Sequence, residues 1–113
     1  MQDDDALLLD MLIAAERVRR FASGYTLESF TQDEVLQSAA RYQLQIIGEA
    51  AWRISDERKA KCETIPWPQI VGFRHRLVHD YARIELPKVW GVIESHIDAL
   101  IKELRKVVPP EAD

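Results

Sequence analysis

Residues 65–81 read IPWPQIVGFRHRLVHDY, and this stretch decides both the expected fold and the expected site. Prolines at 66 and 68 suit the first turn of a helix, where a backbone N–H has no partner to lose. An apolar frame of Phe73, Leu77 and Val78 follows, which predicts a helix that runs to about Tyr81. Within this frame, four side chains that are cationic or can become so occupy six positions: Arg74, His75, Arg76 and His79. A helix that only fills a core has no need of such a cluster.

Three more stretches outside this one have apolar residues at helical spacing. The first runs from about Asp4 to Phe21, with Leu8, Leu12, Ala15 and Val18 on one face. The second follows a predicted capping box of Thr31 with Glu34, has a wide apolar face that begins at Val35, and ends near Ser55. The third covers residues 86–106, with an inward face predicted at Val89, Ile93, Ile97, Leu100, Ile101 and Leu104. No segment alternates with period two, so we expect an all-α protein, with 23–30 as a connector and 55–64 as a polar turn.

The composition is that of one ordinary water-exposed globular domain. We expect a single domain over residues 1–108 and a short flexible tail at 109–113. No run of 18 apolar residues is present, so no membrane contact is expected. The net charge of −4 argues against a protein that coats nucleic acid by charge alone, although a local basic site remains compatible with it. Cys62 is the only cysteine, which excludes an intrachain disulfide and fits a cytoplasmic location.

Helical spacing separates the members of the cationic cluster. His75 and His79 are one turn apart and share a face, and Arg76 with Asp80 at the same spacing predicts a surface ion pair. Arg74 and His79 are five residues apart, about 140° around an ideal helix, so one chain does not bring them together. Either the end of the helix is distorted, or a second copy of the chain across a two-fold axis gathers Arg74 and His79 of both chains around one cleft.

Histidine and arginine together suit the cleavage of a phosphodiester in RNA. Histidine moves protons near neutral pH, and the guanidinium offers a fork of donors that matches phosphate oxygens. RNA supplies its own nucleophile, the 2′-hydroxyl, so we expect no metal and no cofactor. Two alternatives stay open: a zinc site on His75 and His79, for which no third ligand lies nearby in the sequence, and a purely structural role for the cluster.

Several landmarks in chain order resemble one family. They are ESF at 28–30, IIGEAA at 46–51, IPW at 65–67, GFRHRLVHDY at 72–81 and VW at 89–90. With them the chain resembles HepT-like proteins of the HEPN superfamily, the ribonuclease toxins of MNT–HepT toxin–antitoxin pairs, over nearly its whole length. The family signature is arginine, a polar residue, three further positions and histidine, here Arg74, His75 and His79. Asparagine is common in the family where this chain has His75.

This resemblance implies a four-helix up-and-down HEPN-type bundle that forms a homodimer. It implies a metal-independent endoribonuclease, the toxin of a type VII-like pair, with Arg74 and His79 as catalytic residues and His75 and Arg76 positioning the RNA. It also implies a minimal nucleotidyltransferase antitoxin as partner, which attaches AMP to the motif tyrosine, Tyr81. A catalytically inactive HEPN-like dimer that serves as a binding platform for the nucleotidyltransferase is the alternative function, and a helical bundle without a site is a third.

Residues on the second and neighbouring helices have two interpretations each. Glu49 could support Arg74 or His79, or it could cap a network or reach solvent. The tryptophans Trp52, Trp67 and Trp90 could stack on bases, but we expect each to pack in the core or in a dimer interface. Gly48 interrupts the second helix, which predicts close packing against another helix.

Overall fold

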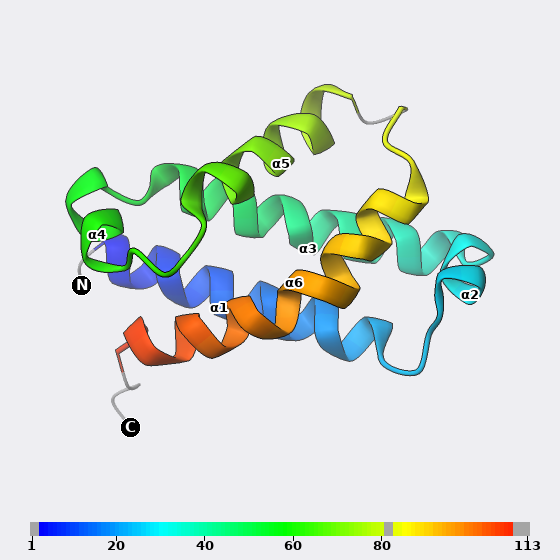
Figure 1. The fold of residues 1–113 in the computed structure, drawn as a ribbon, viewed down its shortest axis with the longest axis horizontal. Coiled ribbons are helices and arrows are strands. Elements are labelled where there is room, and N and C mark those ends of the chain that lie inside the picture. The colour runs from blue at the N-terminus through cyan, green and yellow to red at the C-terminus, as the bar shows by residue number, and fades with distance from the viewer. Residues whose placement is uncertain (1–2, 81–82, 110–113) are drawn as a thin grey trace.

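The computed structural model describes residues 3–80 and 83–109, and every element in that part of the chain is a helix. The described residues form four long helices and two short ones, whose arrangement is drawn in Figure 1. The elements are α1 (Asp3–Ala22), α2 (Leu27–Thr31), α3 (Glu34–Arg53), α4 (Asp56–Lys61), α5 (Trp67–His79) and α6 (Leu86–Val107). The predicted all-α class is therefore confirmed. None of the described helices is long and apolar enough to cross a bilayer.

The long helices run up and down, and α1 and α3 form the central pair. They lie side by side in opposite directions, with α2 joining them at one end and α4 following α3 at the other (Figure 1). Helix α5 packs on α3, and α6 packs on α1. The two outer helices have no extensive contact with one another within the described residues. Helix α5 therefore packs on the bundle mainly through α3.

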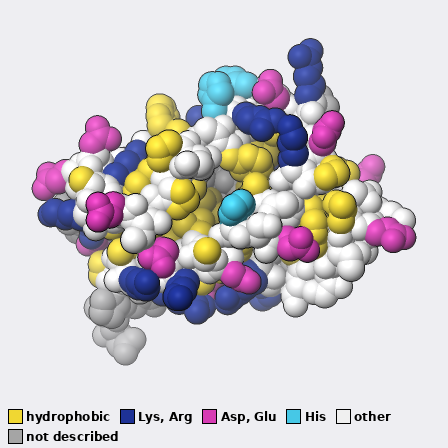
Figure 2. Space-filling model, viewed as in Figure 1, with side chains coloured by type: hydrophobic (Ala, Val, Ile, Leu, Met, Phe, Trp, Pro, Cys, Tyr) yellow, Lys and Arg dark blue, Asp and Glu magenta, His cyan; other side chains and the backbone are white. Residues whose placement is uncertain are grey.

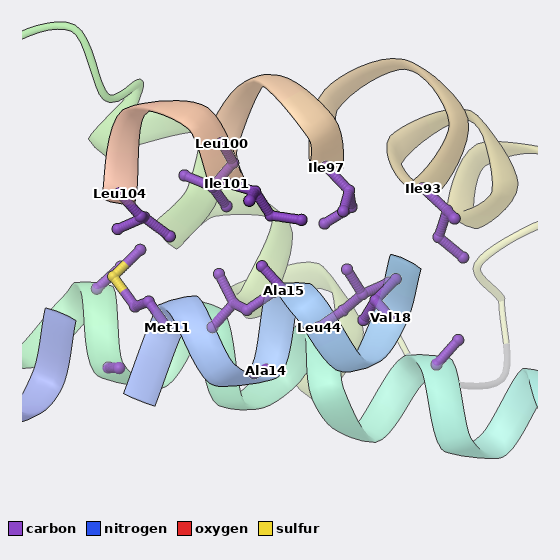
Figure 3. Packing of buried hydrophobic residues seen from close by; sticks show 14 of the residues in the cluster. Met11, Ala14, Ala15, Val18, Leu44, Ile93, Ile97, Leu100, Ile101 and Leu104 are labelled. Atoms are coloured by element: carbon purple, nitrogen blue, oxygen red, sulfur yellow. The ribbon is translucent and has the colours of Figure 1, made fainter. Parts of the chain in front are cut away.

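The core lies between α6 and the α1/α3 pair. All six α6 residues predicted to face inward are buried: Val89, Ile93, Ile97, Leu100, Ile101 and Leu104. Figure 3 shows five of them directed at Met11, Ala15 and Val18 of α1 and at Leu44 of α3. This apolar burial is the main force that holds the bundle together, since each buried leucine or isoleucine contributes roughly 1.5–3 kcal/mol.

The two short helices are a correction to the sequence-based prediction, and their polar caps explain them. Residues predicted as connector and polar turn form α2 and α4. The Thr26 hydroxyl accepts a hydrogen bond from the backbone N–H of Ser29, and the Ser29 hydroxyl accepts one from the backbone N–H of Thr26. These two bonds form a capping box at the start of α2. Ser55 caps α4 by accepting from the N–H of Arg58 at 3.1 Å. A cap can start a helix too short to show a periodic pattern.

The start of α3 is a second correction. Thr31 ends α2, and Asp33 is the residue that caps α3, its carboxylate accepting from the Leu36 N–H at 2.9 Å. The predicted Thr31–Glu34 box is therefore wrong. Val35, predicted to begin the inward face of this helix, is 81% exposed, because the true inward face begins at Leu36.

The last turn of α5 also differs in detail. The helix ends at His79, and the N–H of Asp80 closes it by donating to the carbonyl of Arg76 at 2.8 Å. The predicted ion pair between Arg76 and Asp80 is not among the ion pairs of residues 3–80 and 83–109. The predicted helix end at Tyr81 lies outside the described residues.

Candidate functional site

Helix α5 is anchored at its start and exposed along much of its length. Trp67 is buried, and its indole N–H donates to the carbonyl of Cys62 at 3.0 Å. Leu77 is the other buried residue of this helix. Most of the remaining side chains are partly or fully exposed, and they include all four members of the cationic cluster. The helix thus presents the cluster on a fixed frame.

Gly48 sets how closely α5 approaches α3. A Cβ on Gly48 would lie 2.0 Å from the Cβ of Arg74 and 2.6 Å from its Cγ, distances that real side chains do not tolerate. The predicted close packing at this glycine is confirmed. The residue it admits is Arg74, so the stem of the motif arginine is held against the backbone of α3.

The guanidinium of Arg74 lies over the ring of Trp52, one helical turn beyond Gly48 on α3. Its Cζ is 5.3 Å from the ring centroid, which is a cation–π arrangement. The Nε atom of Arg74 is buried and has no hydrogen-bond partner, and no carboxylate among the described residues pairs with this guanidinium. The positive charge is therefore held in place by an aromatic ring and is not neutralised by an acidic side chain.

The two histidines form a pair on the outer side of α5. The ring centroids of His75 and His79 are 4.3 Å apart, and both residues are exposed, as is Arg76. Figure 2 shows histidine side chains gathered over α5 with Lys and Arg side chains close by. The predicted shared face of His75 and His79 is confirmed. These imidazoles are open to a ligand that approaches from solvent.

Apolar surface is visible between the two outer helices. Figure 2 shows hydrophobic side chains along the band between α5 and α6. On the α5 side, Ile70, Val71 and Phe73 are only partly buried, and Val78 is 37% exposed. The chain therefore leaves apolar surface uncovered on the same helix as the cationic cluster.

Glu49 lies apart from the cluster. It is exposed and lines a hollow between α1 and α3 together with Asp10, Tyr42 and Arg53. It makes no hydrogen bond or ion pair with Arg74 or His79 in the described part of the chain. Of its two sequence-based interpretations, the structure matches the one in which it reaches solvent.

The three tryptophans divide into two kinds. Trp67 and Trp90 are each 7% exposed, and Trp90 packs on Phe30 with ring centroids 5.2 Å apart, so core packing is confirmed for both. Trp52 is 59% exposed and is not part of this chain's core. The sequence did indicate where Trp52 lies, because it follows Gly48 by four residues and therefore shares a face of α3 with it.

Within residues 3–80 and 83–109, no three histidine, cysteine, aspartate or glutamate side chains converge as a metal site would require. Tyr81, the predicted site of AMP attachment, lies outside the described residues. Among its described residues, α5 presents the side chains of two arginines and two histidines.

The chain matches one protein-family description, "Ribonuclease HepT-like", over residues 11–107. It is 33% identical over 96 residues to "Putative RNase TTE0752" of Caldanaerobacter subterraneus subsp. tengcongensis, an alignment that covers 85% of this chain and 82% of that protein. It is 29% identical over 106 residues to "Putative RNase MJ1380" of Methanocaldococcus jannaschii, covering 94% and 97% of the two chains. It is also 29% identical over 100 residues to "Probable ribonuclease HepT" of Thermococcus cleftensis, covering 88% and 91%. No solved structure matches the chain.

Proposed function

Because this chain belongs to the HepT-like ribonuclease family, we propose that it is a metal-independent endoribonuclease and the toxin of an MNT–HepT-type toxin–antitoxin pair. The observation that carries the proposal is the state of Arg74. Its stem is clamped against Gly48 and its guanidinium lies on Trp52 without a carboxylate partner. An arginine held in this way is prepared to accept an anion, and a phosphate of RNA has the matching charge and geometry.

The reaction needs one proton removed and one proton supplied. The 2′-hydroxyl loses its proton to a base as its oxygen attacks the adjacent phosphorus, and the bond from phosphorus to the 5′-oxygen breaks. That 5′-oxygen takes up a proton as it leaves, which gives a 2′,3′-cyclic phosphate and a 5′-hydroxyl end. His79 transfers a proton in this scheme, and Arg74 stabilises the charge that grows on the phosphate oxygens. His75 and Arg76 position the RNA.

A homodimer completes the site. Arg74 is turned toward α3 and His79 lies with His75 on the outer side of α5, so one protomer offers them in different directions. The uncovered apolar residues of α5 are suited to pack on a second copy of the chain. A two-fold axis beside α5 would bring the arginine of one protomer toward the histidine of the other.

The control of the toxin is the second part of the proposal. A minimal nucleotidyltransferase antitoxin attaches AMP to Tyr81, two residues after His79 in the sequence. The added phosphate has the charge of the RNA phosphate and would compete for Arg74, while the adenosine would block access by its size. The cytoplasm, where RNA and ATP are both present, is the proposed location.

The experiment that tests the activity uses the purified full-length chain and a single-stranded RNA, with and without EDTA. Cleavage should persist in EDTA and yield 2′,3′-cyclic phosphate ends, which mass spectrometry of the fragments identifies. Loss of cleavage in EDTA would overturn the metal-independent mechanism. A dimer that binds a nucleotidyltransferase but cuts no RNA would favour the inactive-platform alternative.

A further inference from the structure

Trp52 combines two properties that the fold does not require. It is 59% exposed, whereas Trp67 and Trp90 are each 7% exposed and serve the core. It also lies beside Arg74, the member of the cationic cluster whose stem packs against Gly48 of α3, and the Arg74 guanidinium is 5.3 Å from its ring centroid. A large aromatic surface and an unneutralised cation are therefore adjacent at the site.

We infer that Trp52 is a stacking platform for a nucleobase of the RNA, next to the phosphate that Arg74 contacts. The inference rests on the proposed ribonuclease function and names a subsite within it. A base is joined to its phosphate through a single sugar, so a ring and a guanidinium in contact can engage the two parts of one nucleotide. Aromatic side chains beside cationic groups are the common means by which proteins hold single-stranded nucleic acid.

The charge of the whole chain supports a subsite of this kind. With a net charge of −4, the protein gains little affinity for RNA from long-range attraction. Stacking does not depend on net charge, and it is only weakly affected by salt. It can therefore supply affinity that a few isolated cations cannot.

The substrate follows from the geometry. A base can lie on Trp52 only if it is free of its own neighbours and its pairing partner. The subsite accordingly selects unpaired nucleotides, and it tolerates any base because every base has a flat face. Double-stranded RNA should be a poor ligand.

Binding is measured first, with a single-stranded oligonucleotide whose 2′-hydroxyls are all methylated so that it cannot be cut. Tryptophan emission should be quenched on binding, and the quenching should vanish in Trp52→Phe, because the other two tryptophans are buried. Trp52→Ala should weaken binding by roughly 5- to 150-fold, the usual range for one stacked base. The matched control is Tyr42→Ala, since Tyr42 is 62% exposed on the same helix but lines the hollow toward α1; its affinity should not change.

Salt dependence separates stacking from an indirect effect on Arg74. Loss of one phosphate contact in Arg74→Gln should reduce the slope of log affinity against log salt by about 0.7 for a single strand. Trp52→Ala should lower the affinity and leave this slope unchanged. A reduced slope in Trp52→Ala would mean that the ring only positions the arginine, and the inference would be overturned.

A substrate that lacks one base provides the decisive comparison. Removing the base at the subsite should weaken binding to the wild-type chain but should add nothing to the defect of Trp52→Ala. Equal losses in both proteins would show that no base contacts this ring. Light scattering should show that Trp52→Ala is still a dimer. If this variant is monomeric and regains its affinity for RNA at high protein concentration, Trp52 belongs to the dimer interface and the inference is overturned.

The two proposals fail in different ways. If unmodified RNA is not cut but the methylated oligonucleotide shows these dependences on Trp52, the ribonuclease proposal fails and the stacking subsite stands. If Trp52→Ala cuts RNA at the wild-type rate, and the wild-type chain cuts intact and abasic substrates at the same rate, the stacking subsite fails and the ribonuclease proposal stands.

Discussion

A Cβ on Gly48 would lie 2.0 Å from the Cβ of Arg74, so α3 meets the motif arginine at a point that only glycine permits. This contact links the packing of the bundle to the position of the site. Helix α5, which packs on α3, carries the residue expected to hold the phosphate.

Gly48→Ala should therefore destabilise the fold. Overpacking costs about 1–3 kcal/mol, and a clash with the Cβ of Arg74 lies toward the upper end of this range, above the roughly 1 kcal/mol that alanine adds to a helix over glycine. Urea unfolding should show a lower midpoint than wild type. RNA cleavage should fall as well, because α5 has to move and carries Arg74 with it.

Gly91→Ala is the matched control for that change. Gly91 lies within α6, and a Cβ there would meet no atom within 4 Å. Its substitution should raise the free energy of unfolding by about 0.4–1 kcal/mol. If the two alanine variants are equally stable, the contact between α3 and Arg74 is looser than the structure has it.

The two histidines should differ in their effect on cleavage although their rings are 4.3 Å apart. His79→Asn should lower kcat by about 10²–10⁴-fold, since it removes the proposed proton-transfer group. His75→Asn should retain cleavage within roughly tenfold, because a positioning group can be replaced by another polar side chain. Circular dichroism should show an unchanged fold for both. If the His75 variant is the inactive one, the two assignments are reversed.

The long helices could be predicted from the sequence because their apolar faces are continuous. The two short helices, which begin at polar capping residues, could not. Six of the seven buried residues of α6 could be predicted from helical spacing, since every third or fourth residue is a large aliphatic; the seventh is Trp90. Helix α2 covers five residues and α4 covers six, too few for periodicity to emerge. The choice between Thr31 and Asp33 as the cap of α3 depended on where α2 ends, which pattern alone did not reveal.

Asp33 leads to a test by pH. Its pKa is held below the ordinary value of 3.8, first by the backbone N–H of Leu36 and then by the hydroxyl of Tyr25. A lowered folded-state pKa means that the unfolded chain takes up the proton at higher pH. The stability from this group is therefore fully present above the ordinary value and is lost as pH falls through the folded-state pKa.

Asp33→Asn keeps an acceptor at the cap and removes the titration. Thermal unfolding should show wild type more stable than the variant at neutral pH, with the difference shrinking toward zero in strong acid. Glu94→Gln, an exposed change within α6, should give no such convergence. A gap between wild type and Asp33→Asn that stays constant down to the lowest pH would mean that the carboxylate's charge does not stabilise α3.

Tyr81 separates control from catalysis. Tyr81→Phe should cut RNA at a near-normal rate, since its hydroxyl takes no part in the proposed reaction. It should escape silencing by a cognate nucleotidyltransferase and ATP, whereas the wild-type chain gains the mass of one AMP and loses activity. If the phenylalanine variant is still silenced and carries AMP on another residue, the modification site has been misplaced.

The site itself was only partly predictable. Spacing alone placed His75 with His79 and set Arg74 apart, because helical geometry fixes those directions. The contact between Trp52 and Arg74 depends on how α5 packs on α3. These two residues are distant in sequence, so no local pattern predicts their contact. Glu49 belongs to the same helix and to the same landmark as Gly48, yet it lies on the side toward α1.

Mixed dimers test whether two copies share one site. Arg74→Ala and His79→Ala should each be inactive alone, and mixing them with brief unfolding and refolding should restore cleavage. Half of the dimers would then carry one variant of each kind, and in these the arginine of one protomer meets the histidine of the other. Activity should return to roughly a quarter of the wild-type value if each dimer has two independent composite sites.

The same treatment applied to either variant alone is the control and should yield no activity. If the mixture stays inactive although mass spectrometry detects mixed dimers, each protomer must supply both residues, and α5 would have to distort within a single chain to bring Arg74 and His79 together.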